Sequence, residues 1–469
     1  MIASILTEQQ IREIHAQTLQ VLERTGVRFW NSPRALQVLA KAGCAVREER
    51  VFFPPEVVNW ALGALPDREA LAMHSPEGGR TVSLASRQVN FSTVGNAYYV
   101  YDFQRGEQRD IEVQDVEQYW VLFENLEHFA IRVGELILRS WRHGGQQPIS
   151  ARCETAEQAI ACFRDLHERK RVPAKPIITS IGRTREQVRI GILQSLLYRS
   201  SLADLQQRPT TGVWVNPLSP LQYDDQTEGI VEGAQQGIPI MISPEIMGGS
   251  TGPITLAGIL VQQNAEVLAG LVLAQATRPA TTVIYGSLSG PMDPRVADIS
   301  MGSIEANVVQ CATVQIADFY GLPSRIAAGN TGAKAPGPRA VTEAALGVFM
   351  GAAAGANIIT TGLLDCTLML SYEHMALLDE IMGAVKRACR GVDIDEARFA
   401  LSEIHREGKP GGSYLTSAHT LEHLRGELFL SDFFGRAADS YEDWYQHAHR
   451  KVRRLFDTKA KVDFGRQVT

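Results

Sequence analysis

The chain has 469 residues, of which 45% are hydrophobic and 21% are charged, and its formal net charge is -6. This composition is typical of a globular protein with a large core. The negative charge argues against nucleic acid as the main partner, because phosphate binding needs clustered Lys and Arg. The N-terminus lacks the pattern of a secretory signal, and we expect a cytoplasmic protein without a membrane span. Six scattered cysteines indicate neither a disulfide framework nor a zinc site.

Residues 1–87 are predicted to form a helical and hairpin cap. Apolar positions recur at helical spacing over residues 5–26 and stop at Gly26. Two shorter helices are expected, one after Ser32 and one that begins at the paired prolines 54 and 55. Short alternating segments then indicate hairpin strands. This pattern favours a cap on another unit over an independent catalytic domain.

Residues 88–390 alternate short apolar runs with helix patterns. The runs lie near residues 88–94, 129–136, 176–182, 211–217, 238–244, 281–288, 324–330 and 357–363. Roughly eight strand–helix units close a barrel, and continuous apolar strands fit its parallel sheet, which is buried on both faces. We therefore predict the α/β class and a (β/α)8 TIM barrel. An open doubly wound sheet is the alternative, but no convincing nucleotide fingerprint accompanies it.

Residues 391–469 are polar and aromatic, with strong turn signals in the segment 408–420. We expect a loop that crosses the outside of the barrel, followed by one or two terminal helices packed on it. The predicted domains are thus a cap (1–87), a barrel (88–390) and a C-terminal extension (391–469).

The residues expected at the carboxyl ends of the strands, where barrel active sites lie, are rich in aromatic and amide groups. Ring faces of this kind attract a quaternary ammonium group. Spacing typical of a metal site is not found. We predict Glu245, Asn330 and His374 as catalytic residues and Tyr98, Tyr99, Trp214, Tyr285, Arg325 and Tyr372 as substrate-binding residues.

The glycine-rich segment 242–257, ISPEIMGGSTGPITLA, follows the fifth predicted strand. A phosphate-binding loop is one interpretation, but the segment lacks the lysine of a P-loop and the spacing of a dinucleotide fingerprint. A nucleophile elbow at Ser250 is another, but an oxyanion segment of the usual type does not accompany it. We favour a third interpretation, in which the glycines let the backbone approach a small ligand or a partner.

Several motifs resemble the trimethylamine methyltransferase family over essentially the whole chain. They are NPLSPLQY (216–223), GPITLAG (252–258), VIYGSLSGPMDPR (283–295), SYEHMALLDEI (371–381) and GGSYLTSAHTLEHLR (411–425). The resemblance implies a TIM-barrel enzyme that moves a methyl group from a methylated amine to the Co(I) corrinoid of a small partner protein. It implies that the chain itself binds no cofactor, since the corrinoid (cobalamin) is carried by the partner.

The chain contains only standard residues and therefore resembles the branch without pyrrolysine. That branch implies glycine betaine as the substrate, with proline betaine, carnitine or a non-catalytic betaine-binding protein as alternatives. In the segment 330–343, Gly332 and Gly337 stand where the family commonly has acidic residues. A homo-oligomer is compatible with the size of the barrel.

A quaternary ammonium already carries a neutral amine as its leaving group, so its demethylation needs no general acid. We expect Tyr98, Trp214 and Tyr285 to enclose the ammonium and Glu245 to balance its charge. The substrate carboxylate would then be bound by Arg325, by Asn330 or by the N-terminus of the helix after the fifth strand.

Overall fold

Eight parallel strands form the centre of the computed structural model, which describes residues 4–76, 78–93, 97–133, 174–178, 185–431 and 441–459 together with residues 136 and 433. The strands are β6 (Asn90–Thr93), β9 (Phe129–Val133), β10 (Ile177–Ile178), β11 (Val213–Val215), β13 (Ile240–Ile242), β15 (Val283–Ser287), β18 (Ser324–Ile326) and β19 (Ile358–Thr361). Parallel ladders join them in the order β10-β9-β6-β19-β18-β15-β13-β11. Among these eight strands the first in the chain, β6, thus pairs with the last, β19, as in a (β/α)8 barrel. The predicted TIM barrel is confirmed, with a strand at each of the eight predicted positions.

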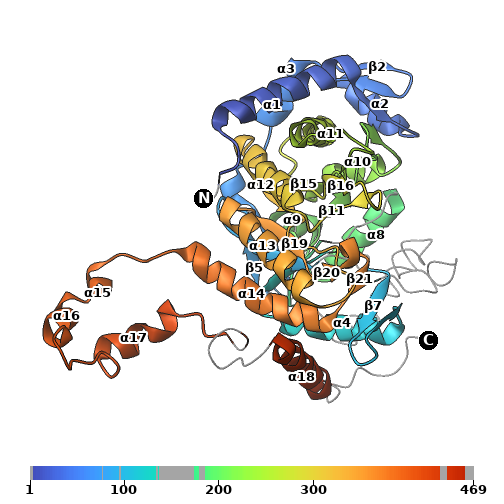
Figure 1. The fold of residues 1–469 in the computed structure, drawn as a ribbon. Coiled ribbons are helices and arrows are strands. Elements are labelled where there is room, and N and C mark those ends of the chain that lie inside the picture. The colour runs from blue at the N-terminus through green and yellow to red at the C-terminus, as the bar shows by residue number, and fades with distance from the viewer. Residues whose placement is uncertain are drawn as a thin grey trace.

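Helices cover the outside of this sheet (Figure 1). Those that the structure describes are α4 (Val113–Asn125), α8 (Arg185–Leu196), α9 (Leu202–Gln207), α10 (Thr227–Gln236), α11 (Leu256–Thr277), α12 (Ile304–Phe319), α13 (Pro338–Ala354) and α14 (Tyr372–Arg390). Four of them begin at a hydroxyl side chain, which accepts a hydrogen bond from a first-turn amide: Ser201, Thr255, Ser303 and Ser371. α13 instead begins at a proline, which needs no acceptor for an amide proton.

α11 is the one helix in the described part of the chain that is long and apolar enough to cross a membrane. Within its most apolar window, 72% of the residues are buried inside the protein. The helix packs against α1 (Glu8–Gln20), α2 (Pro33–Lys41), α3 (Pro55–Gly63), α10 and α12. An all-round apolar surface is what a helix enclosed by other helices requires.

The N-terminal cap supplies much of this enclosure, as the blue elements above α11 in Figure 1 show. Besides α1, α2 and α3 it contains η1 (Val21–Thr25), η2 (Arg68–Ala70), β1 (Val27–Phe29), β2 (Ala45–Arg47) and β3 (Arg50–Phe52). β12 (Gln222–Tyr223), from the loop after β11, joins this sheet beside β1. The rings of Phe29 and Tyr223 stack at 5.2 Å between centroids, which ties the cap to the barrel.

A hairpin of the cap closes one end of the barrel interior. It consists of β4 (Ala72–His74) and β5 (Thr81–Ser83), and its buried residues Met73 and Val82 pack with Met241, Ile284 and Ile358 of the barrel strands. The inward side chains of successive strands form layers in a barrel of this type. This apolar layer is therefore the floor on which the polar residues nearer the carboxyl ends of the strands rest.

Two small sheets follow the carboxyl ends of the barrel strands. One consists of β14 (Met247–Gly248), β16 (Gly290–Asp293) and β17 (Asp298–Ile299), and the other of β7 (Tyr99–Asp102), β8 (Glu107–Asp110), β20 (Leu363–Leu364) and β21 (Met369–Leu370), with η3 (Asp365–Thr367) between its last two strands. Each is built from loops that leave neighbouring barrel strands, so the loops support one another around that end of the barrel.

The C-terminal extension contains α15 (Glu396–Phe399), α16 (Leu401–Glu407), α17 (Ala418–Glu427) and α18 (Tyr441–Lys459). α18 packs against α14 and α4. α15, α16 and α17 instead extend away from the barrel, as Figure 1 shows. The domain boundaries drawn from the sequence stay a prediction.

Candidate active site

Neighbouring strands place Ser243, Gly286 and Arg325 side by side on the inner wall of the barrel. Gly286 of β15 pairs with Arg325 of β18, and Ile242 of β13 pairs with Tyr285. A Cβ atom added at Gly286 would overlap the Oγ atom of Ser243, so only glycine fits at this point. Since Gly286 has no side chain, nothing from β15 separates Ser243 from Arg325 at this level.

Arg325 is wholly buried and has two unused donor groups. Its Nε donates to the Oγ1 atom of Thr360 at 2.7 Å, whereas Nη1 and Nη2 have no hydrogen-bond partner. The guanidinium lies over the ring of Trp214, 4.8 Å from its centroid. Burial lowers the pKa of Arg325 to about 9, and the charge of Glu245 opposes this shift. A buried guanidinium with unpaired donors is costly, and an anionic ligand would satisfy it.

Three further polar groups of this wall are buried and unpaired. They are the Nε1 of Trp214, the Oγ of Ser243 and the Oδ1 of Asn330. The Nδ2 of Asn330 donates to the carbonyl oxygen of Thr360 at 2.9 Å, so Thr360 holds both Asn330 and Arg325 in place. Buried polar groups in folded proteins are nearly always paired, and a group of unpaired ones at one place indicates a ligand site.

Glu245 follows β13 at the same end of the barrel. Its side chain is exposed to solvent, yet desolvation by the surrounding protein raises its pKa. Arg325 opposes this shift and Asp298 adds to it. A carboxylate that solvent reaches while protein crowds it on several sides has the environment expected at a binding site.

Apolar residues from β11 and from the loops after β15, β18 and β19 pack together beside these polar groups. We call them the mouth cluster: Leu288, Met301 and Ala327, which are buried, with Trp214, Ile299 and Cys366, which are partly buried. Trp214 also packs against the floor of the barrel. The site therefore combines unpaired donors, one acidic side chain and an apolar surface.

The structure brings together four of the residues predicted from the sequence: Trp214, Glu245, Arg325 and Asn330. Tyr98 and Tyr99 lie nearby, at the small sheet above β6 and β19, where their backbone amides donate to the carbonyl oxygen of Leu368. Tyr99 packs in an apolar cluster of that sheet.

Tyr285, Tyr372 and His374 lie elsewhere, Tyr285 between β15 and α11 and the other two between neighbouring helices. The hydroxyl of Tyr285 donates to Asn264 of α11 at 3.1 Å, because odd and even residues of β15 face opposite sides of the barrel wall.

Tyr372 and His374 belong to α14. The Tyr372 hydroxyl donates to a carboxylate oxygen of Asp115 at 2.7 Å. The Nδ1 of His374 lies 3.4 Å from the hydroxyl of Tyr445 in α18, and burial lowers the pKa of His374 to about 4. Both side chains thus join α14 to neighbouring helices.

Ser243, Thr360 and the members of the mouth cluster other than Trp214 were not identified from the sequence. Ser243 lies two residues after the inward-facing Met241, and Thr360 lies two residues after the inward-facing Ile358. The signal that finds them is the period of two along each strand, counted from a residue known to face inward.

The glycine-rich segment after β13 uses its amides internally. Gly249 donates to Gly252, Ser250 and Thr251 donate to the carbonyl oxygen of Met247, and Met247 donates to the hydroxyl of Thr251. Its strand β14 pairs with β16 beside the barrel end. Because these amides are already paired with one another, they are not free to bind a phosphate group.

Among the described residues, no group of three or more His, Cys, Asp and Glu side chains is placed to hold a metal ion.

A family model described as trimethylamine methyltransferase matches residues 2–462. The chain belongs to the trimethylamine methyltransferase family. Within the family it is 31% identical to a glycine betaine methyltransferase of Desulfitobacterium hafniense, over 94% of this chain and 88% of that protein. It is 28% identical to a trimethylamine methyltransferase of Methanosarcina thermophila, over 96% of this chain and 92% of that protein.

A solved structure of a monomethylamine methyltransferase from Methanosarcina barkeri aligns with 95% of this chain and 92% of its own. The identity is 15% and the TM-score is 0.47. The assignment to the trimethylamine methyltransferase family rests on the sequence comparisons, and the fold follows from the strand order.

The close approach at Gly286 gives a testable prediction. The substitution Gly286→Ala is expected to lower the free energy of unfolding by about 1–3 kcal/mol, because the added methyl group overlaps Ser243 and the backbone of Ile242. Denaturant unfolding measures the effect. Gly63→Ala is the control, since nothing lies within 4 Å of a Cβ atom there, and it should leave stability nearly unchanged. Equal effects of the two substitutions would contradict the close approach.

Proposed function

We propose that this protein is a methyltransferase that moves a methyl group from a quaternary amine, glycine betaine, to the Co(I) corrinoid of a partner protein. Membership of the family and the name of one relative support the reaction class. The observation that carries the choice of substrate is Arg325, a wholly buried guanidinium with two unpaired donors beside a tryptophan and an acid. Glycine betaine has a carboxylate and a quaternary ammonium one carbon apart, and it needs both kinds of partner.

The carboxylate of the substrate fits the unpaired donors. Nη1 and Nη2 of Arg325 can bind one carboxylate through parallel hydrogen bonds, and Nε1 of Trp214 is a third free donor at the same wall. Trimethylamine has no carboxylate and would leave these groups unpaired. The site is therefore suited to a betaine more than to a simple amine.

The ammonium end of the substrate carries no N–H group and needs no hydrogen-bond acceptor. It needs negative charge and polarisable or apolar surface, which Glu245 and the mouth cluster supply. With the carboxylate bound at the inner wall, the methyl groups would face the carboxyl ends of the strands. That is the end at which a partner protein can approach.

The reaction needs neither a general acid nor a nucleophilic side chain from this protein. Displacement of a methyl group from glycine betaine breaks one C–N bond and leaves dimethylglycine with a neutral amine and an ionised carboxylate, so no proton has to be supplied. The methyl acceptor is the partner's Co(I) corrinoid, which provides the electron pair of the new bond. This chain would orient the substrate and exclude water, and the apolar floor beneath Trp214 serves the second purpose.

The affinity for glycine betaine is expected to fall by about tenfold as the pH drops through the pKa of Glu245, since a protonated carboxyl group no longer balances the ammonium. Because this pKa is raised above its usual value, the loss begins at a higher pH than for an ordinary glutamate. The ligand's own carboxylate stays ionised above about pH 4. Calorimetric titration over a pH series measures the effect.

Glu245→Gln is the matched variant for that series. Its affinity should be lower near neutral pH and should not change as the pH drops. A wild-type affinity that is constant over the series, or a variant that keeps the wild-type pH dependence, would contradict the role of Glu245.

The proposed function is tested with a panel of ligands and a reduced corrinoid protein. Glycine betaine should bind and should give the absorbance of a methylated corrinoid. Its carbon isostere 3,3-dimethylbutanoate keeps the carboxylate and the shape but lacks the charge, and tetramethylammonium keeps the charge but lacks the carboxylate. Both should bind more weakly. A stronger methylated-corrinoid signal with proline betaine or carnitine would indicate that this compound is the substrate. Binding without any methyl transfer would indicate a betaine-binding protein.

A further inference from the structure

The segment 391–431, which we call the arm, leaves the barrel at the end of α14 and carries α15, α16 and α17. Figure 1 shows it extending away from the body of the molecule. None of its three helices packs extensively against a helix of the barrel in the described part of the chain. The arm therefore projects from the barrel, and contacts with the barrel helices do not account for its conformation.

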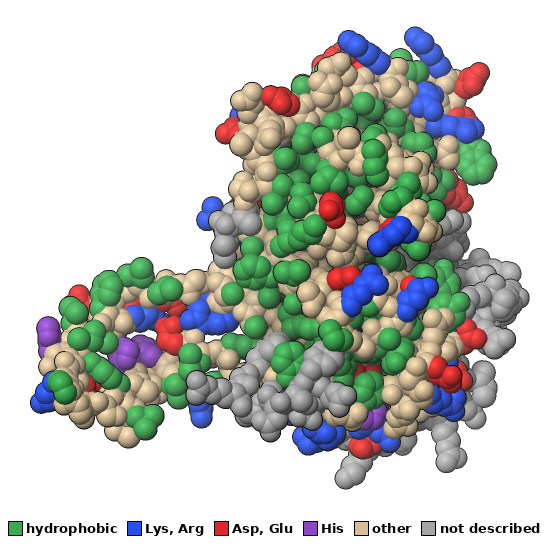
Figure 2. Space-filling model, in the orientation of Figure 1, with side chains coloured by type: hydrophobic (Ala, Val, Ile, Leu, Met, Phe, Trp, Pro, Cys, Tyr) green, Lys and Arg blue, Asp and Glu red, His purple; other side chains and the backbone are tan. Residues whose placement is uncertain are grey.

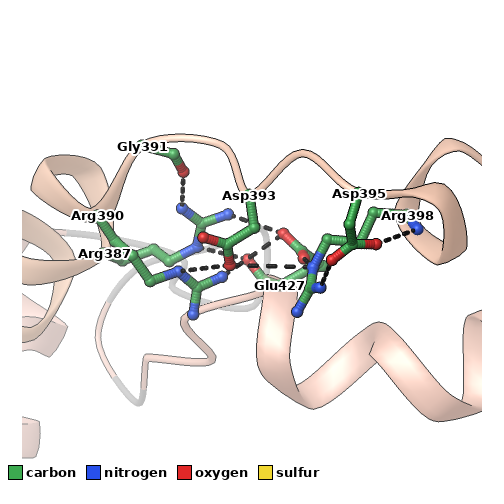
Figure 3. Close-up of polar contacts among 7 residues, drawn as sticks. All are labelled: Arg387, Arg390, Gly391, Asp393, Asp395, Arg398 and Glu427. Atoms are coloured by element: carbon green, nitrogen blue, oxygen red, sulfur yellow. Dashed lines mark hydrogen bonds and ion pairs between the residues drawn. The ribbon is translucent and has the colours of Figure 1, made fainter.

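An ion-pair network fixes the base of the arm (Figure 3). Glu427, the last residue of α17, receives hydrogen bonds from Arg387 of α14 through its carbonyl oxygen at 2.6 Å and its carboxylate at 3.2 Å. The same carboxylate lies 3.6 Å from Arg390 and 3.4 Å from Arg398 of α15. Arg398 in turn pairs with Asp395. The two ends of the arm are thus joined to each other and to the barrel.

The arm exposes many large apolar side chains. Eleven are at least 41% exposed: Val392, Ile394, Phe399, Leu401, Ile404, Tyr414, Leu415, Leu421, Leu424, Leu428 and Leu430. Leu415 and Val392 reach 78% and 81%. Hydrophobic side chains are correspondingly frequent on the arm in Figure 2.

The apolar area of the arm is of the size that an interface uses. A large apolar side chain has on the order of 200 Å² of surface, so eleven half-exposed ones present on the order of 1,000 Å². The largest apolar patch of an ordinary monomer is about 300–600 Å². A stable interface buries about 800 Å² per partner, and permanent interfaces are the more apolar ones.

The position of the arm indicates which partner covers it. Each barrel helix runs back from the carboxyl ends of the strands, so the end of α14 lies at the opposite end of the barrel from Arg325 and Glu245. A protein that collects a methyl group must approach the site end. The arm is therefore placed for a permanent structural contact.

We propose that the arm is the interface through which this chain binds a second copy of itself. The ion pairs join the two ends of the arm before association, which lowers the entropy cost of binding. The exposed apolar surface of the arm does not depend on the substrate, whereas the choice of a second copy over a methyl-accepting partner rests on the proposed function.

The mass of the full-length protein in solution tests the proposal. Light scattering after size-exclusion chromatography should give at least twice the chain mass of 51.6 kDa. The double substitution Leu415→Asp and Leu421→Asp should shift this mass to that of one chain with the circular dichroism unchanged. Ile254→Asp, at a side chain outside the arm that is 57% exposed, is the control and should leave the mass unchanged.

A second measurement covers the case in which the double variant does not fold. A photo-reactive phenylalanine analogue at position 415 of the otherwise unchanged chain should give a cross-linked dimer on irradiation. A monomeric wild-type protein, an unchanged mass for a folded double variant, or cross-links to a corrinoid protein in place of a second copy would each overturn the proposal.

Discussion

Replacing Arg325 with Met is expected to weaken glycine betaine binding by about 100-fold or more. Methionine has a similar length but no donor, so the substrate carboxylate would be buried without its charge-assisted hydrogen bonds. Removing one partner of a buried charged pair typically costs about 2–5 kcal/mol, and 100-fold corresponds to about 2.7 kcal/mol. Calorimetric titration of the wild type and Arg325→Met with glycine betaine measures the change directly.

The specificity of this loss distinguishes binding from damage to the fold. Tetramethylammonium has no carboxylate, so its affinity should change by less than about threefold. The thermal midpoint of the ligand-free variant should stay the same or rise, because the wild type buries an unpaired guanidinium at a cost. Arg325→Lys keeps the charge but not the two parallel donors. Its affinity for glycine betaine should therefore lie between those of the wild type and Arg325→Met. An equal loss for both ligands would contradict the assignment of the carboxylate to Arg325.

The second large effect is expected at Trp214. This ring packs against the floor of the barrel, belongs to the mouth cluster and lies against the guanidinium of Arg325. Trp214→Ala should lower the free energy of unfolding by about 3–5 kcal/mol, because it leaves a large gap between the floor and the mouth. The gap would also free the Arg325 side chain, and glycine betaine binding should fall by at least about tenfold.

Trp214→Phe separates the two roles of the ring. Phenylalanine fills most of the volume and keeps an aromatic face for the guanidinium, but it lacks the Nε1 donor. Stability should fall by much less than with alanine, while glycine betaine affinity should still decrease by about fivefold, which corresponds to one hydrogen bond. Denaturant unfolding and calorimetry measure the two quantities. If Trp214→Ala left both unchanged, the packing role and the binding role of the ring would both be wrong.

The barrel could be predicted from the sequence because its strands repeat. Continuous apolar runs between helix patterns indicate a parallel sheet whatever the surrounding residues are, and eight of them imply closure. The same feature limits prediction of the site. When both faces of a strand are buried, the apolar pattern does not show which residues face the interior, so Tyr285 and Gly286 cannot be told apart by hydrophobicity.

Other residues were placed by contacts between distant segments. Tyr372 and His374 follow the last barrel strand, β19, but the hairpin of β20 and β21 lies between them and that strand, and both residues belong to α14. Ser243 became a candidate because its hydroxyl oxygen is buried and unpaired, which only the packed structure reveals. The projection of the arm is a further case, since an apolar helix pattern does not show which surface will cover it.

The central claim is that this site holds glycine betaine with a methyl group open to a corrinoid. The most direct test is a single-turnover reaction of the purified protein with glycine betaine and a stoichiometric Co(I) corrinoid protein, in which both products are quantified. We predict one dimethylglycine for each methylated corrinoid formed, with the Arg325→Met variant slowed by about 100-fold at subsaturating substrate. Absence of both products with a competent corrinoid protein, or an equal rate for the variant, would contradict the account.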